Sequence, residues 1–421
     1  MPSTVHRRSL LVGSLAAPVF IRTQVARSEK RYDPGASDTE IKLGTTSPYS
    51  GPASSFGAYG WAQSAYFAML NEQGGINGRK VNLISLDDGY SPPKTIEQTR
   101  RLVEADGVLA IAGALGTAPN SATQRYLNGK KVPALFLVSG GSRFNNPAAY
   151  PWTVPLYPQY NRVGRVFAKH LLDTTPNARI GVLYLNDDLG KDFLGGLKDG
   201  LGARAETMIV EAQSHEISEP VVDGQIVKLN DARTDTVFLL TTPKFTAQAI
   251  RKIADMEWKP RRYLATVSGS IETTLKPAGI EHSVGVITAA WEKRVDDPTW
   301  AEAPDVGAFL AFMKKYLPSA NVGDETYIPG YINANMVAYV LKQCGDDLTR
   351  ANILKHATSL DGVTPPMLLP GVQLSNSPTD YTSYHQLALV RFDGARWVRM
   401  GELIDLNTVS PKAARTASER R

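Results

Sequence analysis

The chain has 421 residues, of which 43% are hydrophobic and 21% are charged, and it contains a single cysteine. A domain typically has roughly 150 residues, so this length predicts two or three domains, and the composition excludes a chain that is disordered throughout. One cysteine excludes an internal disulfide and any metal site built from several cysteines.

The formal net charge of +5 comes from the two ends of the chain. Residues 1–28 carry four arginines and no acid, and the last ten residues carry four basic residues and one glutamate. The remaining chain has 38 basic and 40 acidic residues, which is a net charge of −2. Because no interior basic run could neutralise a phosphate backbone, a nucleic-acid partner is not expected.

Residues 1–28 are predicted to be an export signal, which places the protein in the periplasm. Arg7 and Arg8 precede an apolar run over 10–21 that is too short to cross a bilayer, since a crossing takes about 20 residues. This pattern resembles a twin-arginine signal, and its best cleavage position follows Ser28. The alternative interpretation is an amphipathic first helix.

Short apolar segments after residue 38 are predicted to be strands. They lie at 41–45, 81–86, 108–113, 133–138, 180–185, 207–211, 236–240, 263–267 and 284–289. Several of them, such as 134–138 and 237–240, are apolar on both faces, as the buried strands of a parallel sheet require. The sequence therefore predicts parallel rather than antiparallel sheets for most of the chain.

Helical patterns separate these strands. Ala58, Ala62, Ala65 and Met69 recur at helical spacing, and the pattern ends at Gly74-Gly75. Such strand–helix alternation predicts an α/β fold with helices on both faces of each sheet. Since nine strands are many for one compact sheet, we expect two lobes.

Further helices and a hairpin are predicted along the chain. Pro92-Pro93 open a helix in which Ile96, Leu102 and Val103 are expected to face inward. The elements predicted after residue 300 are helices at 308–316 and 332–343 and a hairpin with strands at 386–390 and 397–400. The turn of that hairpin is Asp393-Gly394, a dipeptide that is typical of tight turns.

Common catalytic and metal-binding patterns are missing from the sequence. No nucleophile elbow, zinc-protease helix, phosphate loop or dinucleotide fingerprint is present, and no two of the six histidines share a metal-ligand spacing. Two acid pairs, Asp87-Asp88 and Asp187-Asp188, follow predicted strands. We favour helix capping for both over a catalytic carboxylate pair. We therefore expect no enzyme activity, no cofactor and no metal, and an exported α/β enzyme is kept as a minor alternative.

Glycine and hydroxyl residues gather where predicted strands end. These clusters are 44–47 (Gly-Thr-Thr-Ser), 113–117 (Gly-Ala-Leu-Gly-Thr) and 139–142 (Ser-Gly-Gly-Ser). Ligands of open α/β sheets bind at the carboxyl ends of the strands, where helix N-termini present free N–H groups. Any one cluster could be an ordinary cap or turn, but three of them together predict a site for a small carboxylate.

The segments around these clusters resemble those of the leucine/isoleucine/valine-binding proteins, the type I periplasmic solute-binding components of ABC importers. The similarity covers 44–57 (Gly-Thr-Thr-Ser-Pro-Tyr-Ser-Gly-Pro-Ala-Ser-Ser-Phe-Gly) and 71–79 (Asn-Glu-Gln-Gly-Gly-Ile-Asn-Gly-Arg). It continues through Asp87-Asp88 with Pro92, the 113–117 turn, Val132-Pro133 and 187–191 (Asp-Asp-Leu-Gly-Lys). The resemblance extends over residues 39–400.

The resemblance implies two Rossmann-like lobes joined by three crossovers and closing over a ligand. The crossovers are expected near Val154-Pro155, near Ala289-Ala290 and within 365–370. Lobe 1 would then comprise 39–155 with 290–366, and lobe 2 would comprise 156–289 with 367–402. Residues 403–421 are expected to form a basic flexible tail.

The resemblance also implies a site for the ligand carboxylate in lobe 1. In this family a hydroxyl and a small-residue turn after two neighbouring strands grip that group, and Thr117, Gly140 and Ser142 stand at the matching positions. Phe56, Trp291 and Tyr49 are expected as walls of the site. The disulfide of the family is missing, because Tyr90 and Gly116 occupy the expected positions.

On the lobe 2 side the sequence departs from the relatives that bind α-amino acids. Their ammonium-binding acid is expected within 265–270, where this chain has no acid and offers Ser268 instead. Leu189 and Thr242 stand where aromatic residues are usual. Since a buried ammonium without a partner costs several kcal/mol, a plain carboxylate with an apolar or aromatic body is favoured over a zwitterion.

The leading hypothesis is a monomeric periplasmic substrate-binding protein. It would deliver a small carboxylate, aromatic or branched aliphatic, to an ABC permease in the inner membrane. Two alternatives stay open, namely a receptor for a true branched-chain amino acid and a sensing module of the same fold that regulates a partner protein.

Overall fold

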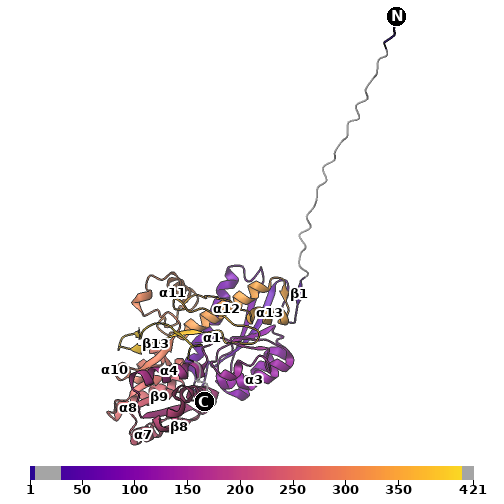
Figure 1. The fold of residues 1–421 in the computed structure, drawn as a ribbon. Coiled ribbons are helices and arrows are strands. Elements are labelled where there is room, and N and C mark those ends of the chain that lie inside the picture. Colours follow the sequence, from indigo (N-terminus) through magenta and orange to yellow (C-terminus); the bar gives the residue numbers. More distant parts are fainter. Residues whose placement is uncertain (5–29, 410–421) are drawn as a thin grey trace, which may run out of the picture.

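The computed structural model describes residues 1–4 and 30–409. These residues form two α/β lobes side by side, with the indigo and purple elements in one and the magenta elements in the other (Figure 1). Most of the predicted export signal, residues 5–29, lies outside the described residues, as do residues 410–421.

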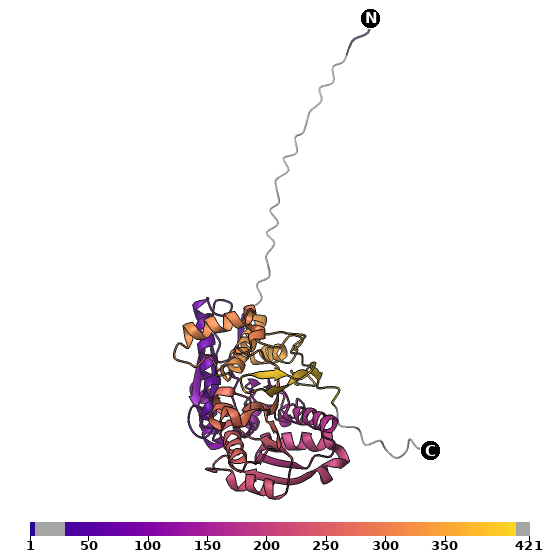
Figure 2. The same cartoon turned by 90° about the vertical axis from the view of Figure 1, so that its left-hand side faces the viewer.

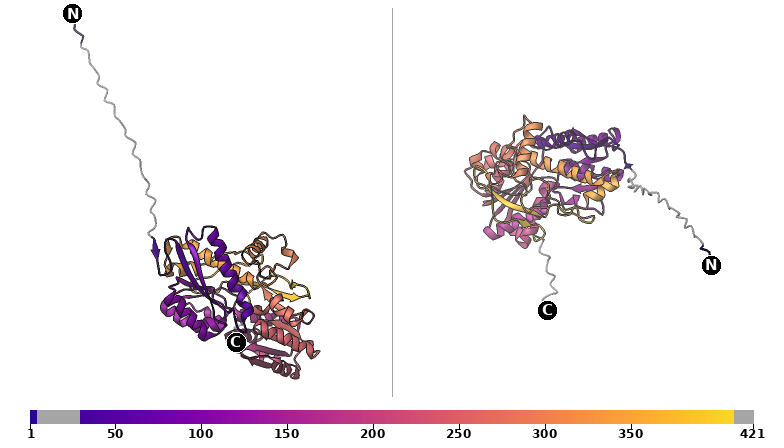
Figure 3. Two further views of the ribbon diagram at one scale, coloured as in Figure 1. Left: turned by 180° about the vertical axis from the view of Figure 1, so that it is seen from behind. Right: turned by 90° about the horizontal axis from the view of Figure 1, so that it is seen from above.

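The first sheet has five parallel strands in the order β3-β2-β4-β5-β6. Their bounds are β2 (Glu40–Ser47), β3 (Lys80–Asp87), β4 (Ala110–Ala112), β5 (Ala134–Leu137) and β6 (Thr153–Pro155). The strand order changes direction at β2 and β4, and Figure 3 shows these strands from behind. In such sheets ligands bind beyond the carboxyl ends of the strands next to that point.

The second sheet has the order β14-β13-β11-β10-β9-β7-β8, and β15 also pairs with β13. Its bounds are β7 (Ile180–Leu185), β8 (Ile209–His215), β9 (Thr236–Leu240), β10 (Arg261–Leu264), β11 (Ile287–Ala290), β13 (Gln386–Phe392), β14 (Trp397–Arg399) and β15 (Ile404–Asp405). The strands β7 to β11 are parallel, whereas β13 runs antiparallel to β11 and β14. A short separate pair joins β1 (Arg31–Tyr32) to β12 (Asp347–Leu348).

Helices cover both sheets. Around the first sheet α1 packs against α12, and α2 packs against α3; around the second sheet α4 packs against α5, and α7 against α8. The helix bounds are α1 (Gly57–Glu72), α2 (Pro92–Arg100), α3 (Thr117–Lys130), α4 (Tyr160–Thr174), α5 (Asp188–Leu201), α6 (Ala205–Met208), α7 (Asp223–Asp231), α8 (Pro243–Asp255), α9 (Lys276–Ala278), α10 (Ile280–Ser283), α11 (Pro304–Tyr316), α12 (Tyr327–Cys344) and α13 (Arg350–Ala357). The predicted α/β fold with parallel sheets is confirmed.

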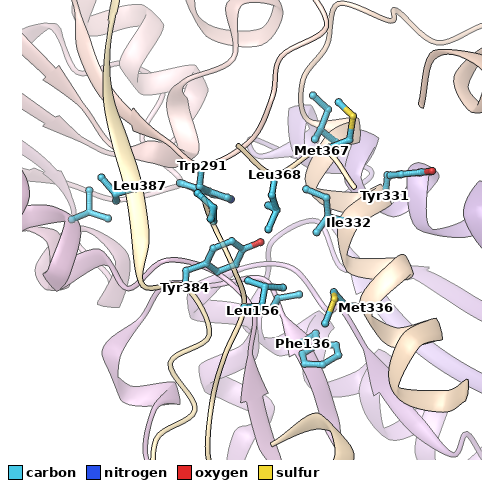
Figure 4. Packing of buried hydrophobic residues seen from close by; sticks show 14 of the residues in the cluster. Phe136, Leu156, Trp291, Tyr331, Ile332, Met336, Met367, Leu368, Tyr384 and Leu387 are labelled. Carbon is cyan, nitrogen blue, oxygen red and sulfur yellow. The ribbon is translucent and has the colours of Figure 1, made fainter. Parts of the chain in front are cut away.

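The chain passes between the two sheets three times. It leaves the first sheet after β6, returns after β11 to the helices α11 to α13, and leaves again before β13, which appears in yellow in Figure 2. Leu156, Trp291 and Leu368, one from each crossing segment, belong to one buried cluster with Tyr384 (Figure 4). The second and third segments also pair directly, because Lys293 N–H donates to the Met367 carbonyl at 2.7 Å.

Three sequence predictions need correction. Residues 205–208 form α6, so the strand predicted at 207–211 begins at Ile209, where it pairs with Ile180. Ile96 is 37% exposed, because α2 rests on Thr95 and Thr99 instead. The third prediction is the assignment of residues 403–409 to the tail.

Residues 403–409 belong to the folded body. Strand β15 pairs with β13, Leu406 is buried, and the Arg165 side chain donates from Nε to the Val409 carbonyl at 2.8 Å. The sequence prediction placed the start of the tail at residue 403 because the C-terminus is basic. The apolar residues Ile404 and Leu406 lie before the basic residues and belong to the folded body.

Candidate ligand-binding cavity

A cavity of about 120 Å³ lies between the two sheets. One water molecule needs roughly 10–15 Å³ on the same scale, so the cavity has room for a small organic molecule. Its walls come from α1, from the strand ends of both sheets and from the second crossing segment. They include Phe56, Tyr59, Tyr90, Leu115, Gly116, Thr117, Val138, Tyr157, Tyr160, Leu189, Thr266, Ser270, Thr288, Trp291, Glu292, Arg294 and Glu325.

One end of the cavity is formed by hydroxyl groups at the start of α3. Thr117 is the first residue of this helix, and its Oγ1 lies 2.8 Å from Ser139 Oγ. The Gly141 N–H donates to Ser139 Oγ at 3.1 Å. Since the Gly141 N–H donates to the Ser139 oxygen, the hydroxyl proton of Ser139 can be donated to Thr117 Oγ1. Thr117 can then donate to an anion near the helix N-terminus.

Two tyrosine hydroxyls complete this end. Burial raises the pKa of Tyr160 to about 12, and its contacts with Thr117, the Gly140 N–H and Ser139 partly offset the rise. Burial also raises the pKa of Tyr90 well above its usual value, and its hydroxyl accepts from the Thr117 N–H. Both phenols therefore stay neutral and act as hydrogen-bond donors at ordinary pH.

The middle of the cavity is lined by rings and aliphatic side chains. Trp291 meets Tyr157 edge to face, with ring centroids 5.0 Å apart, and Tyr160 stacks on Phe193 at 4.6 Å. Phe56, Leu115, Val138 and Leu189 add apolar surface. These walls favour a ligand with an apolar or aromatic body.

The other end of the cavity carries acidic groups. Trp291 Nε1 donates to Glu292 Oε1 at 3.1 Å, and burial raises the pKa of Glu292 to about 7, although Arg294 and this hydrogen bond pull it down. Arg294 is ion-paired with Glu325, which also accepts from the Ile271 N–H at 3.1 Å. The sequence search for an acid covered 265–270, where none is present, and therefore did not include Glu292 or Glu325.

The structure brings four of the predicted site residues to the cavity, namely Phe56, Thr117, Leu189 and Trp291. Ser268 is fully buried and donates to the Thr241 carbonyl at 2.6 Å, and Thr242 is buried at the start of α8. Neither residue lines the cavity. Tyr49, expected as a wall, also lies off the cavity and stacks on Trp61.

Gly140 and Ser142 serve other contacts. A Cβ on Gly140 would lie 2.2 Å from the Pro158 carbonyl oxygen and 2.6 Å from the ring of Tyr160, so the glycine admits this ring to the cavity. The Ser142 N–H and hydroxyl donate to the carboxylate of Asp192 on α5 at 2.6 and 2.7 Å. Ser142 therefore joins the two lobes beside the cavity.

Tyr59, Tyr90, Tyr157, Tyr160 and Glu292 line the cavity without having been predicted. Glu292 follows a predicted strand by three residues, so an inspection of every strand end would have found it. Tyr90 was noted only as a replacement for a cysteine. The structure places its ring against Gly116, where a Cβ would come within 2.8 Å.

The paired acids have local partners. Asp187 caps α5 by accepting from the N–H groups of Leu189 and Gly190 at 2.8 and 3.2 Å. Asp88 accepts from the Tyr90 N–H at 2.9 Å. Within the described ranges, no group of three or more His, Cys, Asp or Glu side chains could hold a metal ion. No helix among those residues is long and apolar enough to cross a membrane.

The fold resembles that of known binding proteins. A structure titled as a branched-chain amino acid ABC transporter protein from Thermus thermophilus with bound valine superposes with a TM-score of 0.79 at 16% identity, covering 89% of this chain and 99% of that one. A fatty acid ABC transporter substrate-binding protein from Thermomonospora curvata gives a TM-score of 0.74 at 19% identity, covering 91% and 97%. At such identities these similarities establish the fold.

Curated sequences match over shorter stretches. The leucine-specific-binding protein of Salmonella typhimurium is 25% identical over 210 residues, which are 48% of this chain and 55% of that protein. An amino acid binding protein of Pseudomonas aeruginosa is 33% identical over 75 residues, which are 18% of this chain and 20% of that protein. The matches thus span about half or less of the relatives' length.

The family profile of the periplasmic binding proteins matches residues 40–396, which is most of the chain. The match begins at β2 and ends at the hairpin of the second sheet, so it includes both lobes and every segment that lines the cavity. The chain belongs to the periplasmic binding protein family and is similar to its leucine/isoleucine/valine-binding type I members.

Proposed function

We propose that this protein is the substrate-binding component of an ABC importer. It is exported to the periplasm, captures a small carboxylate with an apolar or aromatic body between its lobes, and delivers it as a monomer to a permease in the inner membrane. We assign 39–155 with 290–366 to lobe 1 and 156–289 with 367–409 to lobe 2, which extends the second lobe beyond the expected residue 402 because β15 pairs with β13.

The observation that carries this proposal is the position of Thr117. This residue lines the cavity, follows a strand end and opens a helix of 14 residues. The helix N-terminus and the relay from Ser139 together favour a negatively charged group at this point. An organic carboxylate combines a small anionic group for this end of the cavity with an apolar body for the rest of it.

The cavity walls supply the second part of the argument. Aromatic and aliphatic side chains line the cavity between Phe56 and Trp291. When an apolar ligand group replaces water against them, the free energy of the complex is lowered. Leucine, valine and fatty acids, which the names of the relatives mention, share a carboxylate and an apolar body. This common chemistry supports the same ligand class here.

Calorimetric titration tests the proposal. The ligands are 3-phenylpropanoate, 4-methylpentanoate, phenylalanine and leucine, and the variant is Thr117→Val. Loss of a hydrogen bond to a charged group is expected to weaken binding of every ligand that binds the wild type by about tenfold or more, which corresponds to ~1.5–3 kcal/mol.

Thr242→Val is the matched control. Thr242 is also a fully buried threonine that opens a helix, and its hydroxyl has no hydrogen-bond partner, but it lies off the cavity. Its substitution is expected to leave affinity unchanged. Equal affinity of the wild type and Thr117→Val would remove Thr117 from the site.

A further inference from the structure

The turn after β8 carries an apolar residue at its tip. The loop between β8 and α7 begins with a β-turn, in which the Glu219 N–H donates to the Glu216 carbonyl at 3.2 Å and Ile217 is the second residue. Ile217 is half-buried, whereas the residues next to it on both sides are exposed. Turns usually hold polar residues, glycine or proline, so turn chemistry does not explain this isoleucine.

Ile217 packs against apolar clusters of both lobes. On its own side it rests on the lobe 2 core that includes side chains of β7, β9 and α8. On the other side it packs against the lobe 1 cluster of Ala53, Tyr59, Tyr90 and Leu115. The last three of these residues line the ligand cavity, and Ile217 does not. Ile217 therefore supports the cavity wall from outside, across the boundary between the lobes.

Hydrogen bonds fix this turn to lobe 2. Burial lowers the pKa of His215, the last residue of β8, so its ring is neutral and can both donate and accept. Its Nδ1 donates to the Glu216 carbonyl at 3.0 Å, and its Nε2 accepts from the Thr241 hydroxyl at 2.7 Å. The Glu219 side chain accepts from Gln225 Nε2 on α7 at 2.8 Å. The turn is thus held by the ends of β8 and β9 and by α7, and it moves with lobe 2.

The contact between Ile217 and the lobe 1 wall exists only while the lobes touch. Because the turn moves with lobe 2, separation of the lobes exposes the apolar surface on both sides of this contact to water, which is unfavourable. The contact therefore stabilises the arrangement in which the cavity is shut. Since it involves the wall and not the ligand, its contribution is the same for every ligand that fits.

We propose that Ile217 is a clasp residue, whose contact with the lobe 1 wall holds the cavity shut and slows the release of a bound molecule. It is a positioning residue, because it acts through the wall and does not touch the ligand. This inference goes beyond the proposed function, since it depends on the pair of lobes and not on the chemistry of the ligand. Loss of the clasp should speed dissociation about tenfold and leave the association rate within about threefold.

Stopped-flow tryptophan fluorescence measures both rates, with Trp291 at the cavity as a reporter. The probe is whichever of leucine, phenylalanine, 4-methylpentanoate and 3-phenylpropanoate binds the wild type most tightly. Ile217→Ala should release the probe about tenfold faster than the wild type, because most of the apolar contact is lost. Ile217→Leu keeps the apolar volume and should restore the dissociation rate to within about threefold of the wild type.

Val221→Ala is the matched control. Val221 lies in the same loop, is 53% exposed and belongs to neither apolar cluster. Its truncation also shortens a β-branched apolar side chain, but it removes no contact between the lobes. The release of the probe should therefore be as slow as in the wild type.

Hydrogen exchange of the ligand-free protein gives a readout that needs no ligand. The backbone amides of 53–59 and 115–118 belong to the lobe 1 wall and its flanks, and they should exchange faster in Ile217→Ala than in the wild type. The amides of α13 should exchange at the wild-type rate, because this helix contributes to neither apolar cluster and does not line the cavity.

Each outcome bears on one statement. An unchanged dissociation rate in Ile217→Ala, an equal rise in Val221→Ala or fast release from Ile217→Leu would overturn the clasp while the proposed function stands. If none of the four ligands binds the wild type, the proposed function fails, and hydrogen exchange then decides the clasp alone. In that case faster exchange of the wall amides in Ile217→Ala would support the clasp, and equal exchange would overturn it.

Discussion

Ser142, which lies between β5 and β6 of the first sheet, and Asp192 on α5 are joined by two hydrogen bonds of 2.6 and 2.7 Å. Arg143 adds an ion pair with Asp188 of the same helix at 2.7 Å, and Ser121 donates to Asp188 at 3.1 Å. These contacts link the lobes beside the cavity. They would have to break if the lobes separate to admit a ligand.

Asp192→Ala is expected to favour separated lobes. The substitution removes both acceptors of Ser142, and hydrogen bonds to a carboxylate contribute about 1.5–3 kcal/mol. Small-angle scattering should therefore show a larger radius of gyration without ligand, and the affinity for ligand should fall. Lys198→Ala, at an exposed position of the same helix, is the control. An unchanged scattering profile and affinity would show that the link has no role in closure.

Gly140→Ala should destabilise the protein. The new Cβ would lie 2.2 Å from the Pro158 carbonyl oxygen and 2.6 Å from the Tyr160 ring, and backbone cannot yield cheaply. Overpacking of this kind costs about 1–3 kcal/mol or more. Gly129→Ala is the matched control, because a Cβ there meets nothing within 4 Å and lies in α3. Urea denaturation should show Gly140→Ala less stable than the wild type and Gly129→Ala unchanged or more stable.

Glu292→Gln should stabilise the empty protein at high pH. The pKa of this group is about 7 in the fold against 4.5 for an unperturbed glutamate. Its protonated form thus stabilises the fold, fully below pH 4.5, and this contribution is lost as pH rises through 7. The neutral glutamine should raise the free energy of unfolding at pH 8, on the order of 3 kcal/mol, and change it little at pH 4.

Urea denaturation at both pH values checks this prediction. The Glu302→Gln variant controls for the change in net charge, because Glu302 is exposed. A variant that is equally or less stable than the wild type at pH 8 would contradict the raised pKa of Glu292 in the folded protein.

Trp291→Ala should destabilise both lobes together. The side chain is 6% exposed and contacts Tyr157 and Tyr384 where the three crossing segments meet (Figure 4). Truncation of a buried tryptophan costs about 3–5 kcal/mol. Trp61→Ala, at a position that is 47% exposed, should cost far less. Equal thermal stability of the two variants would argue against a shared core at the crossing segments.

Much of the fold could be predicted because its signals are local. Apolar runs such as 236–240 identify buried parallel strands, and β9 has these bounds in the structure. The hairpin around Asp393-Gly394 was likewise found from its turn residues, and β13 pairs with β14 there. The 113–117 cluster, whose last residue Thr117 lines the cavity, could be recognised because a strand end followed by a hydroxyl residue is a local pattern.

The rest of the site depends on contacts between distant segments. Tyr160 reaches the cavity because Gly140 leaves space for its ring, a relation that neither segment shows alone. Among the described residues Glu292 takes part in no ion pair, because Arg294 and Lys293 pair with Glu325 and Asp305, which are further along the chain. Which residues of distant segments contact one another depends on how the folded chain packs. Neither the composition nor the periodicity of the sequence shows these contacts.

The central claim is that the cavity holds a small carboxylate with an apolar body. Native mass spectrometry of the protein purified from the periplasm without denaturation tests it most directly, because the mass of a retained molecule identifies its class. The retained molecule is expected to be a carboxylic acid with an apolar or aromatic group. A retained sugar, nucleotide or other molecule without a carboxylate would contradict it.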